Sequence, residues 1–234
     1  MSNLGIIIFS RFDSVRLPGK AMLELGGMPM LARIIRRAKL TGYPVYLATS
    51  VEQNDDILVA LAEAENIGVF RGSKDDVLTR AVNAAEYFKL NAFARLCGDR
   101  PMFSVDEIER AFLMYNALNN IGSPPHLITN HLFNQQAPGL TTEIIDTFLL
   151  KQISNVATDS LDREHITRYI YSNKVNCSIV SLPLSNVQTT EYRWAVDTSD
   201  DFKRLSYLFS QNTHVGLTIE EATAILLNHQ KTLK

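Results

Sequence analysis

Apolar residues follow two alternating patterns along the first half of the chain. Short continuous apolar runs, such as residues 4–9, are typical of strands that are buried on both faces of a parallel sheet. Between these runs, apolar residues recur every three to four positions, which indicates amphipathic helices. The patterns predict strands at 4–9, 45–48, 68–70 and 92–96, and helices at 30–38, about 55–61, 77–88 and from 105 onward. Strands that alternate with helices predict an α/β fold with a mostly parallel, Rossmann-like sheet.

The second half is less regular and predicts an insertion into the same domain. It contains strand-like pieces at 126–129, 175–182 and 194–196, a predicted helix at 143–153, and helices that begin near Thr198 and Thr218. Asp201 lies in the first turn of the former helix, and Glu221 completes a capping box with Thr218. Because no linker or repeat is evident, we expect a single domain over 1–234, with an inserted lobe or dimerisation arm at about 125–180.

Composition narrows the range of possible partners. The 234 residues include 23 Lys and Arg and 25 Asp and Glu, so the formal net charge is −2, which argues against a broad nucleic-acid-binding surface. Two distant cysteines form neither a disulfide framework nor a metal motif, and we expect them to be reduced. The first apolar run is too short for a signal peptide, and no run reaches the length of a membrane helix. We therefore expect a cytoplasmic protein that binds neither nucleic acid nor membrane.

The loop after the first predicted strand is rich in cations. Ligands of open α/β sheets bind beyond the carboxyl ends of the strands, which is where this loop lies. Ser14 adds a hydroxyl and Gly19 lets the backbone approach a ligand closely, so the loop can wrap a polyphosphate. The alternative is a solvated basic loop, because neither common phosphate-binding glycine motif occurs. The cations are Arg11, Arg16 and Lys20.

Two aspartates stand beyond predicted strands. Asp99 follows the fourth strand, and Asp197 follows the apolar piece at 194–196 and precedes a helix. Carboxylate oxygens are preferred ligands of Mg²⁺, so the two side chains can converge on a metal ion. The alternatives are an ordinary turn at Asp99 and a helix N-terminal acid at Asp197, and Asp200 and Asp201 fit the latter description better.

Charged residues of both signs alternate in the stretch 163–170, which contains Arg163, Glu164 and His165. In a helical stretch, such alternation is usually a solvated, salt-bridged face. A lone histidine in such a stretch is more often structural than catalytic.

Taken in order, these segments resemble the cytidylyltransferase family that activates acidic sugars as CMP-sugars. The matching segments are Arg11, SVRLPGK at 14–20, LGGMPML at 25–31, FRGSKDDVLTR at 70–80, GDRP at 98–101, Gly139 and Leu140 with Glu143, REHIT at 163–167 and VDTSDD at 196–201. The family includes the CMP-Kdo and CMP-acylneuraminate synthetases, and the resemblance is strongest to the branch of spore coat polysaccharide biosynthesis protein F. It covers residues 4 to about 205 and implies a Rossmann-like nucleotidyltransferase fold with an inserted arm.

The resemblance also implies an activity and a role for each candidate residue. CMP passes from CTP to an acidic sugar and pyrophosphate leaves, in the biosynthesis of a surface polysaccharide. The implied nucleotide-binding residues are Arg11, Ser14, Arg16, Gly19, Lys20, Ser73 and Arg80, with the last two near the base. The implied catalytic residues are Arg11, Arg16, Lys20 and Asp99, and the implied Mg²⁺ ligands are Asp99 and Asp197. The implied acceptor-side residues are Arg100, Glu143, Arg163, Glu164 and His165. An arm near 125–180 is implied to build a homodimer.

Departures from the family pattern gather on the acceptor side. Arg100 stands where the branch usually has a small or polar residue; it can pair with Asp99 and weaken Mg²⁺ binding, or reach a carboxylate or phosphate of the acceptor. Ala81, Thr141 and Arg168 depart as well. The alternatives are a nucleotidyltransferase that uses another nucleoside triphosphate or a sugar 1-phosphate, a non-catalytic nucleotide-binding homologue, and a glycosyltransferase.

Overall fold

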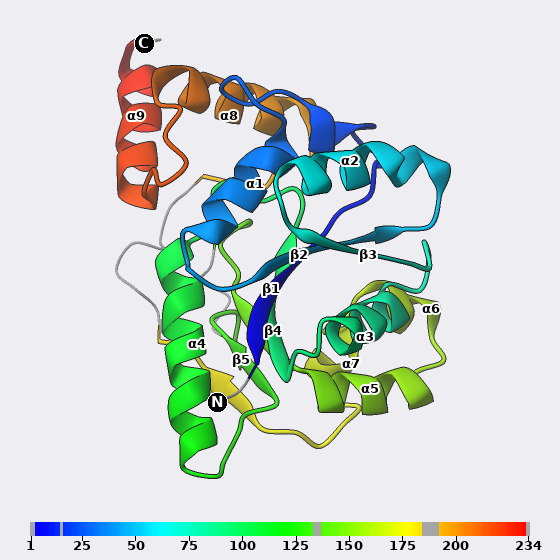
Figure 1. Ribbon diagram of the computed structural model, residues 1–234. Helices are drawn as coiled ribbons and strands as arrows, with labels where there is room; N and C mark the ends of the chain where they lie inside the picture. Colours follow the sequence, from blue (N-terminus) through cyan, green and yellow to red (C-terminus); the bar gives the residue numbers. More distant parts are fainter. Residues whose placement is uncertain (1–2, 15, 133–136, 184–191, 233–234) are drawn as a thin grey trace.

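A sheet with the strand order β3-β2-β1-β4-β6-β5-β7 runs through the middle of the protein (Figure 1). The structure is a computed structural model that describes residues 3–14, 16–132, 137–183 and 192–232. The strands within these residues are β1 (Leu4–Phe9), β2 (Val45–Ser50), β3 (Gly68–Gly72), β4 (Ala92–Cys97), β5 (Leu127–Thr129), β6 (Glu143–Asp146) and β7 (Ile179–Ser181). The predicted mostly parallel, Rossmann-like sheet is confirmed.

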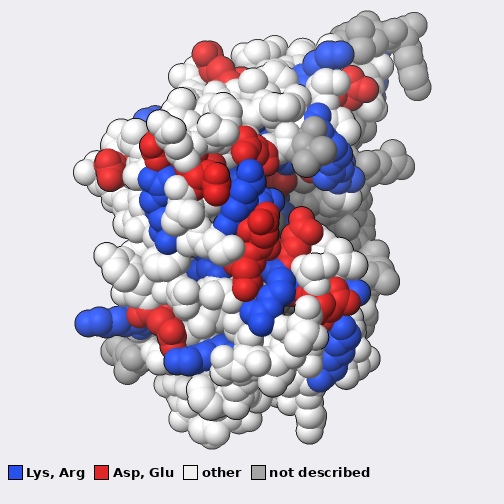
Figure 2. All heavy atoms as spheres, turned by 90° about the vertical axis from the view of Figure 1, so that its right-hand side faces the viewer, with Lys and Arg blue, Asp and Glu red and all other residues white. Residues whose placement is uncertain are grey.

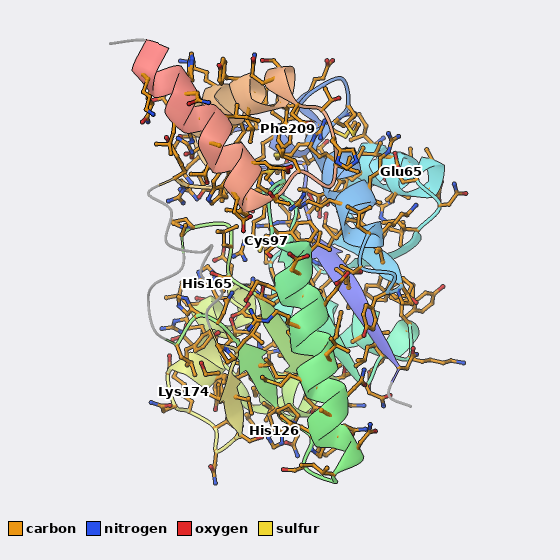
Figure 3. All side chains as sticks on the ribbon, turned by 90° about the vertical axis from the view of Figure 1, so that its left-hand side faces the viewer. Glu65, Cys97, His126, His165, Lys174 and Phe209 are labelled. Atoms are coloured by element: carbon orange, nitrogen blue, oxygen red, sulfur yellow. The ribbon has the colours of Figure 1, made fainter. Side chains whose placement is uncertain are left out.

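Of these strands, only β6 runs against the others. β1 pairs in parallel with β2 and β4, β2 pairs in parallel with β3, and β5 pairs in parallel with β7. β6 is antiparallel to both β4 and β5. Its first residue, Glu143, therefore lies at the edge where the other strands end. Figure 3 shows the two edges: Cys97, at the end of β4, lies at the upper one, and His126, just before β5, at the lower one.

Helices cover both faces of the sheet and create two apolar cores (Figure 1). The helices are α1 (Met30–Lys39), α2 (Asp56–Ala64), α3 (Val77–Tyr87), α4 (Val105–Asn120), α5 (Thr147–Val156), α6 (Ser160–Glu164), α7 (Arg168–Tyr171), α8 (Ser199–Gln211) and α9 (Ile219–Thr232). Successive β1 side chains point to opposite faces: Ile6 and Ile8 join the core with α1, α4 and α8, whereas Ile7 and Phe9 join the core with α3 and α5. Burial on both faces explains the continuous apolar run.

Two parts of the second half differ from the prediction. The helix expected at 143–153 begins four residues late, because residues 143–146 pair with β4 and β5 as strand β6. α5 then begins at Thr147, and the Asp146 side chain caps it by accepting a hydrogen bond from the Leu149 N–H at 2.8 Å. The strand expected at 175–182 is limited to β7. Residues 125–180 thus supply three strands of the common sheet, and their role as a dimerisation arm stays a prediction.

The prediction of a strand at 194–196 is also wrong. Trp194 and Val196 donate backbone hydrogen bonds to the carbonyls of Pro138, at 2.7 Å, and Asp99, at 2.8 Å, and neither residue belongs to a strand among the described residues. We call residues 193–197 the strap, because this segment runs past the end of β4, where the Val196 N–H bonds to the Asp99 carbonyl. Within the described residues, no helix has the length and apolar character needed to cross a membrane.

Two arginines on α1 fasten the C-terminal helices to the rest of the domain. Arg33 donates to the carbonyl of Thr213 at 3.0 Å, and Arg37 donates to those of Val215 and Leu217 at 2.6 and 2.8 Å. Both side chains are buried, and burial lowers the pKa of each to about 10, so each stays charged at neutral pH.

Candidate active site

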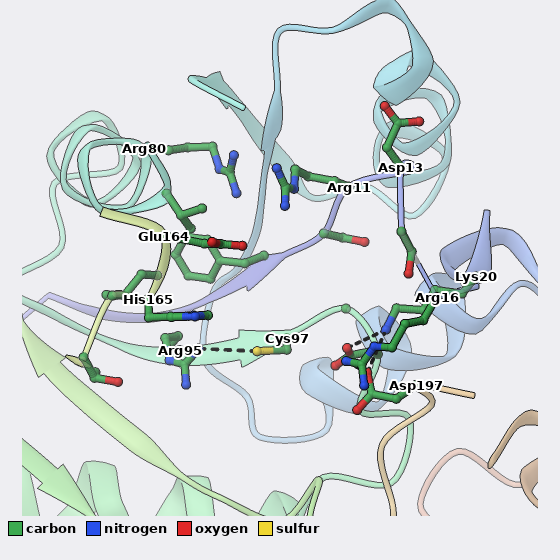
Figure 4. A pocket seen from close by; sticks show the side chains of 18 residues that line it. Arg11, Asp13, Arg16, Lys20, Arg80, Arg95, Cys97, Glu164, His165 and Asp197 are labelled. Atoms are coloured by element: carbon green, nitrogen blue, oxygen red, sulfur yellow. Dashed lines mark hydrogen bonds and ion pairs between the residues drawn. The ribbon is translucent and has the colours of Figure 1, made fainter. Parts of the chain in front are cut away.

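A cavity of about 490 Å³ opens at the edge where β1 and β4 end (Figure 4). Many of the residues predicted from the sequence line it: Arg11, Ser14, Arg16, Lys20, Arg80, Asp99, Glu164, His165 and Asp197. Side chains more than 180 residues apart in the sequence thus meet in one place. Figure 2 shows basic and acidic side chains gathered next to each other on the face that carries α3 and α6, rather than in separate fields.

Local constraints position the basic loop at this edge. The Phe12 N–H donates to the Asp55 carboxylate at 2.7 Å, which anchors the start of the loop to η2 (Gln53–Asp55). Gly98 lies so close to the loop that a Cβ there would come within 2.5 Å of the Ser10 Oγ. Gly19 adopts the left-handed backbone conformation, with φ of 68°, and starts the short helix that carries Lys20. Gly19 therefore shapes the loop and does not line the cavity.

Lys20 is the centre of the charge cluster in this cavity. Its Nζ donates to Asp99 Oδ2 at 2.7 Å and to the Val196 carbonyl at 2.8 Å, and lies 3.4 Å from Asp197 Oδ1. Both carboxylates therefore approach a single cation, as the predicted metal pair requires. The approach depends on the strap, because the Val196 N–H bonds to the Asp99 carbonyl.

Asp197 is held from several sides. Arg16 binds one of its oxygens at 2.9 Å, and Arg193 binds the other. Burial by itself raises the pKa of Asp197, but the Arg193 hydrogen bond and the charges of Lys20 and Arg16 outweigh it and lower the pKa. Asp197 is therefore ionised at neutral pH. It precedes the first turn of α8, whereas Asp201 completes a capping box with Thr198, which confirms Asp201 as a helix N-terminal acid.

The oxygens around Lys20 are suitable ligands for a divalent cation. Two carboxylates and one carbonyl surround the ammonium, and Mg²⁺ prefers such hard oxygen donors. Across the described part of the chain, no group of three or more His, Cys, Asp or Glu residues could hold a metal. Mg²⁺ commonly uses one or two carboxylates and takes further oxygens from substrate phosphates, so this pair fits such an ion.

Arg11 and Arg80 face each other across the upper part of the cavity (Figure 4). Arg11 donates to the Lys74 carbonyl at 2.8 Å, and Arg80 donates to the Ser73 carbonyl at 2.6 Å. Burial, followed by the charge of Arg11, lowers the pKa of Arg80 to about 10. Neither arginine forms an ion pair with a described residue, and the buried Nε of Arg80 has no partner there. These guanidinium groups suit a ligand with negative charge or hydrogen-bond acceptors.

Arg100 and Glu143 line a second cavity, of about 450 Å³. His165, at the break between α6 and α7, lines both cavities. Arg100 donates to the Thr141 carbonyl at 3.0 Å, and within the described residues the ion pair of Asp99 is with Lys20. Of the two alternatives for Arg100, the structure therefore disfavours pairing with Asp99. Arg163 lines neither cavity and pairs with Asp76 at 3.3 Å, at the start of α3.

Two arginines of the site were not anticipated from the sequence. Arg95 lines both cavities and binds Glu143 through its Nε at 2.6 Å. A charge inside an apolar strand was the signal that could have revealed it. Arg193 had no comparable signal, because its contact with Asp197 depends on the conformation of the strap.

Comparisons with known proteins show what the chain is similar to. A family model described as cytidylyltransferase matches residues 5–227. The spore coat polysaccharide biosynthesis protein SpsF of Bacillus subtilis is 30% identical over 220 residues, which are 90% of this chain and 88% of that protein. A 3-deoxy-manno-octulosonate cytidylyltransferase of Solibacter usitatus is 24% identical over 90% of this chain and 96% of its own length. A solved cytidylyltransferase from Leptospira borgpetersenii superposes with a TM-score of 0.91 at 24% identity, covering 99% of this chain and 96% of that chain.

Proposed function

Because the chain belongs to the cytidylyltransferase family, we propose that it transfers CMP from CTP to an acidic sugar, with release of pyrophosphate, in the biosynthesis of a surface polysaccharide. The observation that carries this proposal is the position of Lys20 between Asp99 and Asp197, in the same cavity as Arg11 and Arg80. The names of the relatives, which refer to 3-deoxy-manno-octulosonate and spore coat polysaccharide, support the class of acceptor.

The basic loop binds the triphosphate in this proposal. Lys20 and Arg16 exchange their carboxylate partners for phosphate oxygens when CTP enters, and Arg11 and the Ser14 hydroxyl add further contacts. The cations stabilise the negative charge that develops on pyrophosphate as the bond between the α-phosphorus and its bridging oxygen breaks. Arg80 and the backbone of Ser73 lie on the side of the base.

Asp99 and Asp197 would hold Mg²⁺, which when bound offsets phosphate charge and favours deprotonation of the acceptor hydroxyl. The acceptor oxygen attacks the α-phosphorus in line with the leaving pyrophosphate, and its proton passes to solvent. Glu164 and His165 line the cavity between the two substrates and help to orient them. Positioning and charge stabilisation therefore account for the catalysis, and no covalent enzyme intermediate is required.

A pyrophosphate-release assay tests the proposal. The purified protein is given each of the four nucleoside triphosphates with Mg²⁺ and a panel of acidic sugars and sugar 1-phosphates. We expect turnover with CTP and an acidic sugar, and loss of turnover when the metal is chelated. Turnover of another triphosphate, or of a sugar 1-phosphate, would change the substrate assignment. Absence of turnover together with tight, metal-independent CTP binding would favour a non-catalytic nucleotide-binding protein.

We also propose that the protein is a cytoplasmic homodimer. The segment 125–180 is the proposed arm, and the exposed side chain of Phe148 on α5 is available for such a contact. Light scattering after size-exclusion chromatography should give a mass of twice 26.3 kDa. A monomer at micromolar concentration would contradict this part of the proposal.

A further inference from the structure

The second cavity adjoins the first and shares a wall with it. Arg95, His165 and Thr167 line both. A ligand in the second cavity is therefore next to a ligand in the first, which is the arrangement that group transfer between two substrates requires. The inference below rests on the proposed function, because it concerns the second substrate of that reaction.

Glu143 belongs to the lining of the second cavity, where several hydrogen bonds hold its side chain in place. Its side chain is only 3% exposed and accepts hydrogen bonds from Arg95 Nε at 2.6 Å, the Tyr171 hydroxyl at 2.8 Å and Thr167 Oγ1 at 3.1 Å. Burial by itself raises the pKa of Glu143, but the Arg95 charge, the Tyr171 hydrogen bond and the Arg100 charge together lower it. Glu143 is thus an ionised, fully bonded group whose role is to fix Arg95 and Tyr171 in place.

The positive charges of this cavity are not equivalent. Arg95 is neutralised by Glu143. Arg168 is neutralised by the buried carboxylate of Asp162 and lies 3.6 Å from Asp159. Within the described residues, the Arg100 guanidinium, in contrast, donates one hydrogen bond, to the Thr141 carbonyl, and forms no ion pair. Among these residues, it is the one guanidinium in the lining of the second cavity without a carboxylate partner.

We propose that the second cavity binds the acceptor and that Arg100 selects it by binding its carboxylate. A planar guanidinium matches the two oxygens of a carboxylate, and one unpaired positive charge matches the single charge of that group better than a phosphate dianion. In sugar acids of the probe type, the attacking hydroxyl is on the carbon that carries the carboxylate. Binding of the carboxylate by Arg100 therefore positions the reacting end of the acceptor at the boundary with the first cavity, which His165 and Thr167 also line. Arg100 thereby restricts the reaction to sugars that carry an acid.

Steady-state pyrophosphate release by the full chain tests this inference. The probes are 3-deoxy-manno-octulosonate and N-acetylneuraminate, their carboxamides, and glucose 1-phosphate. In Arg100→Ala, we expect the KM for the sugar acid to rise roughly 10- to 100-fold, as for loss of a charged hydrogen bond, while the KM for CTP stays unchanged. Arg100→Lys should recover part of the effect, because it keeps the charge and loses the planar fork.

Two comparisons separate recognition of the carboxylate from general damage. The carboxamide should have the same high KM with the wild type and with Arg100→Ala. Loss of the carboxylate charge and loss of the arginine each abolish the same contact, so the two changes should not add. Arg36→Ala removes a surface arginine that pairs with Glu65 outside both cavities, and should leave both KM values unchanged.

Three results would overturn the inference. An unchanged KM for the sugar acid in Arg100→Ala, with an active wild type, would refute the role of Arg100 and leave the proposed function intact. A wild-type preference for glucose 1-phosphate that Arg100→Ala loses would replace the carboxylate with a phosphate. A wild type that turns over none of the sugar acids would refute the proposed function, and the inference with it.

Discussion

The two neighbouring cavities handle charge in opposite ways. In the first, Lys20 and Arg16 neutralise Asp99 and Asp197 from a loop, and the Arg16 side chain is 66% exposed. In the second cavity, Glu143 lies at the edge of the sheet and is buried beneath the side chains that bind it. The first arrangement can exchange partners when a charged ligand enters, whereas the second is complete before any ligand arrives.

This difference between the two cavities indicates how one site can exchange ion-pair partners in one part and keep a fixed geometry in the other. The Arg16–Asp197 pair has an exposed arginine and contributes little to stability, so exchanging it for phosphate oxygens costs little. Lys20 is less exposed, but phosphate oxygens replace its carboxylate partners, so its charge stays paired. A buried pair is strongly destabilising to break, so the Arg95–Glu143 pair keeps its geometry and leaves recognition to Arg100. The following substitutions test this division, from the largest expected effect to the smallest.

Glu143→Gln should lower the free energy of unfolding by about 3 kcal/mol, the low end for breaking a buried pair, because it leaves the Arg95 charge without its partner in a partly exposed position. Urea denaturation at neutral pH measures the change. Glu86→Gln, which removes one partner of the exposed pair with Lys151, is the matched control and should cost less than about 1 kcal/mol. Equal losses in the two variants would refute the proposed rigidity of the second cavity.

The effect of pH provides a second test of the same pair. The pKa of Glu143 is lower in the folded protein than its usual value of 4.5, so its stabilisation is fully present above about pH 4.5 and is lost as the pH falls through the folded pKa. The difference in stability between the wild type and Glu143→Gln should therefore be constant between pH 7 and 5 and shrink below that range. A difference that grows on acidification would have the wrong sign.

Lys20→Ala and Asp99→Asn should each lower turnover by at least ~100-fold, equivalent to about 2.7 kcal/mol, because Lys20 supplies a positive charge to the triphosphate and Asp99 would hold the Mg²⁺. Stability should fall less than in Glu143→Gln, since the Asp99 side chain is a quarter exposed and water can replace Lys20. Turnover is measured by pyrophosphate release and stability by urea denaturation. Near-normal turnover in either variant would contradict the assignment of this cavity to the triphosphate.

Thr198→Ala should have the smallest effect, a loss of about 1 kcal/mol in unfolding free energy, as for a helix N-cap. Its side chain completes the capping box with Asp201, directly after the strap that carries Asp197. If the box also holds Asp197 in place, turnover should fall several-fold at saturating CTP. Thr218→Ala at α9 is the matched control, because it removes a similar cap far from the cavities. Equal turnover in the two variants would limit the role of Thr198 to stability.

The sequence predicted best those elements that are defined by local burial. The strand at 4–9 has the predicted bounds, because burial on both faces leaves no position for a polar residue. The helix expected at 143–153 fails at its start, since pairing with β4 and β5 decides the conformation of residues 143–146, and a local pattern cannot encode that pairing.

The residues of the candidate site show the same contrast between local patterns and long-range contacts. The cations of the basic loop and Asp99 follow strands along the chain, so their edge of the sheet could be predicted from their positions alone. The partnership of Arg95 with Glu143 could not, because it depends on an antiparallel pairing between strands 48 residues apart. The orientation of Arg100 likewise depends on Thr141, which belongs to a different segment.

The buried arginines of α1 have a consequence for how the protein is made. Arg33 and Arg37 emerge from the ribosome long before residues 213–217, whose carbonyls accept their hydrogen bonds. Until then, α1 presents two charged groups on the face that it must bury, and Lys20 and Asp99 lack Asp197. A nascent chain that stops before Asp197 therefore lacks both the partners of these arginines and one carboxylate of the first cavity, and both are complete only after residues 197–217 have been synthesised.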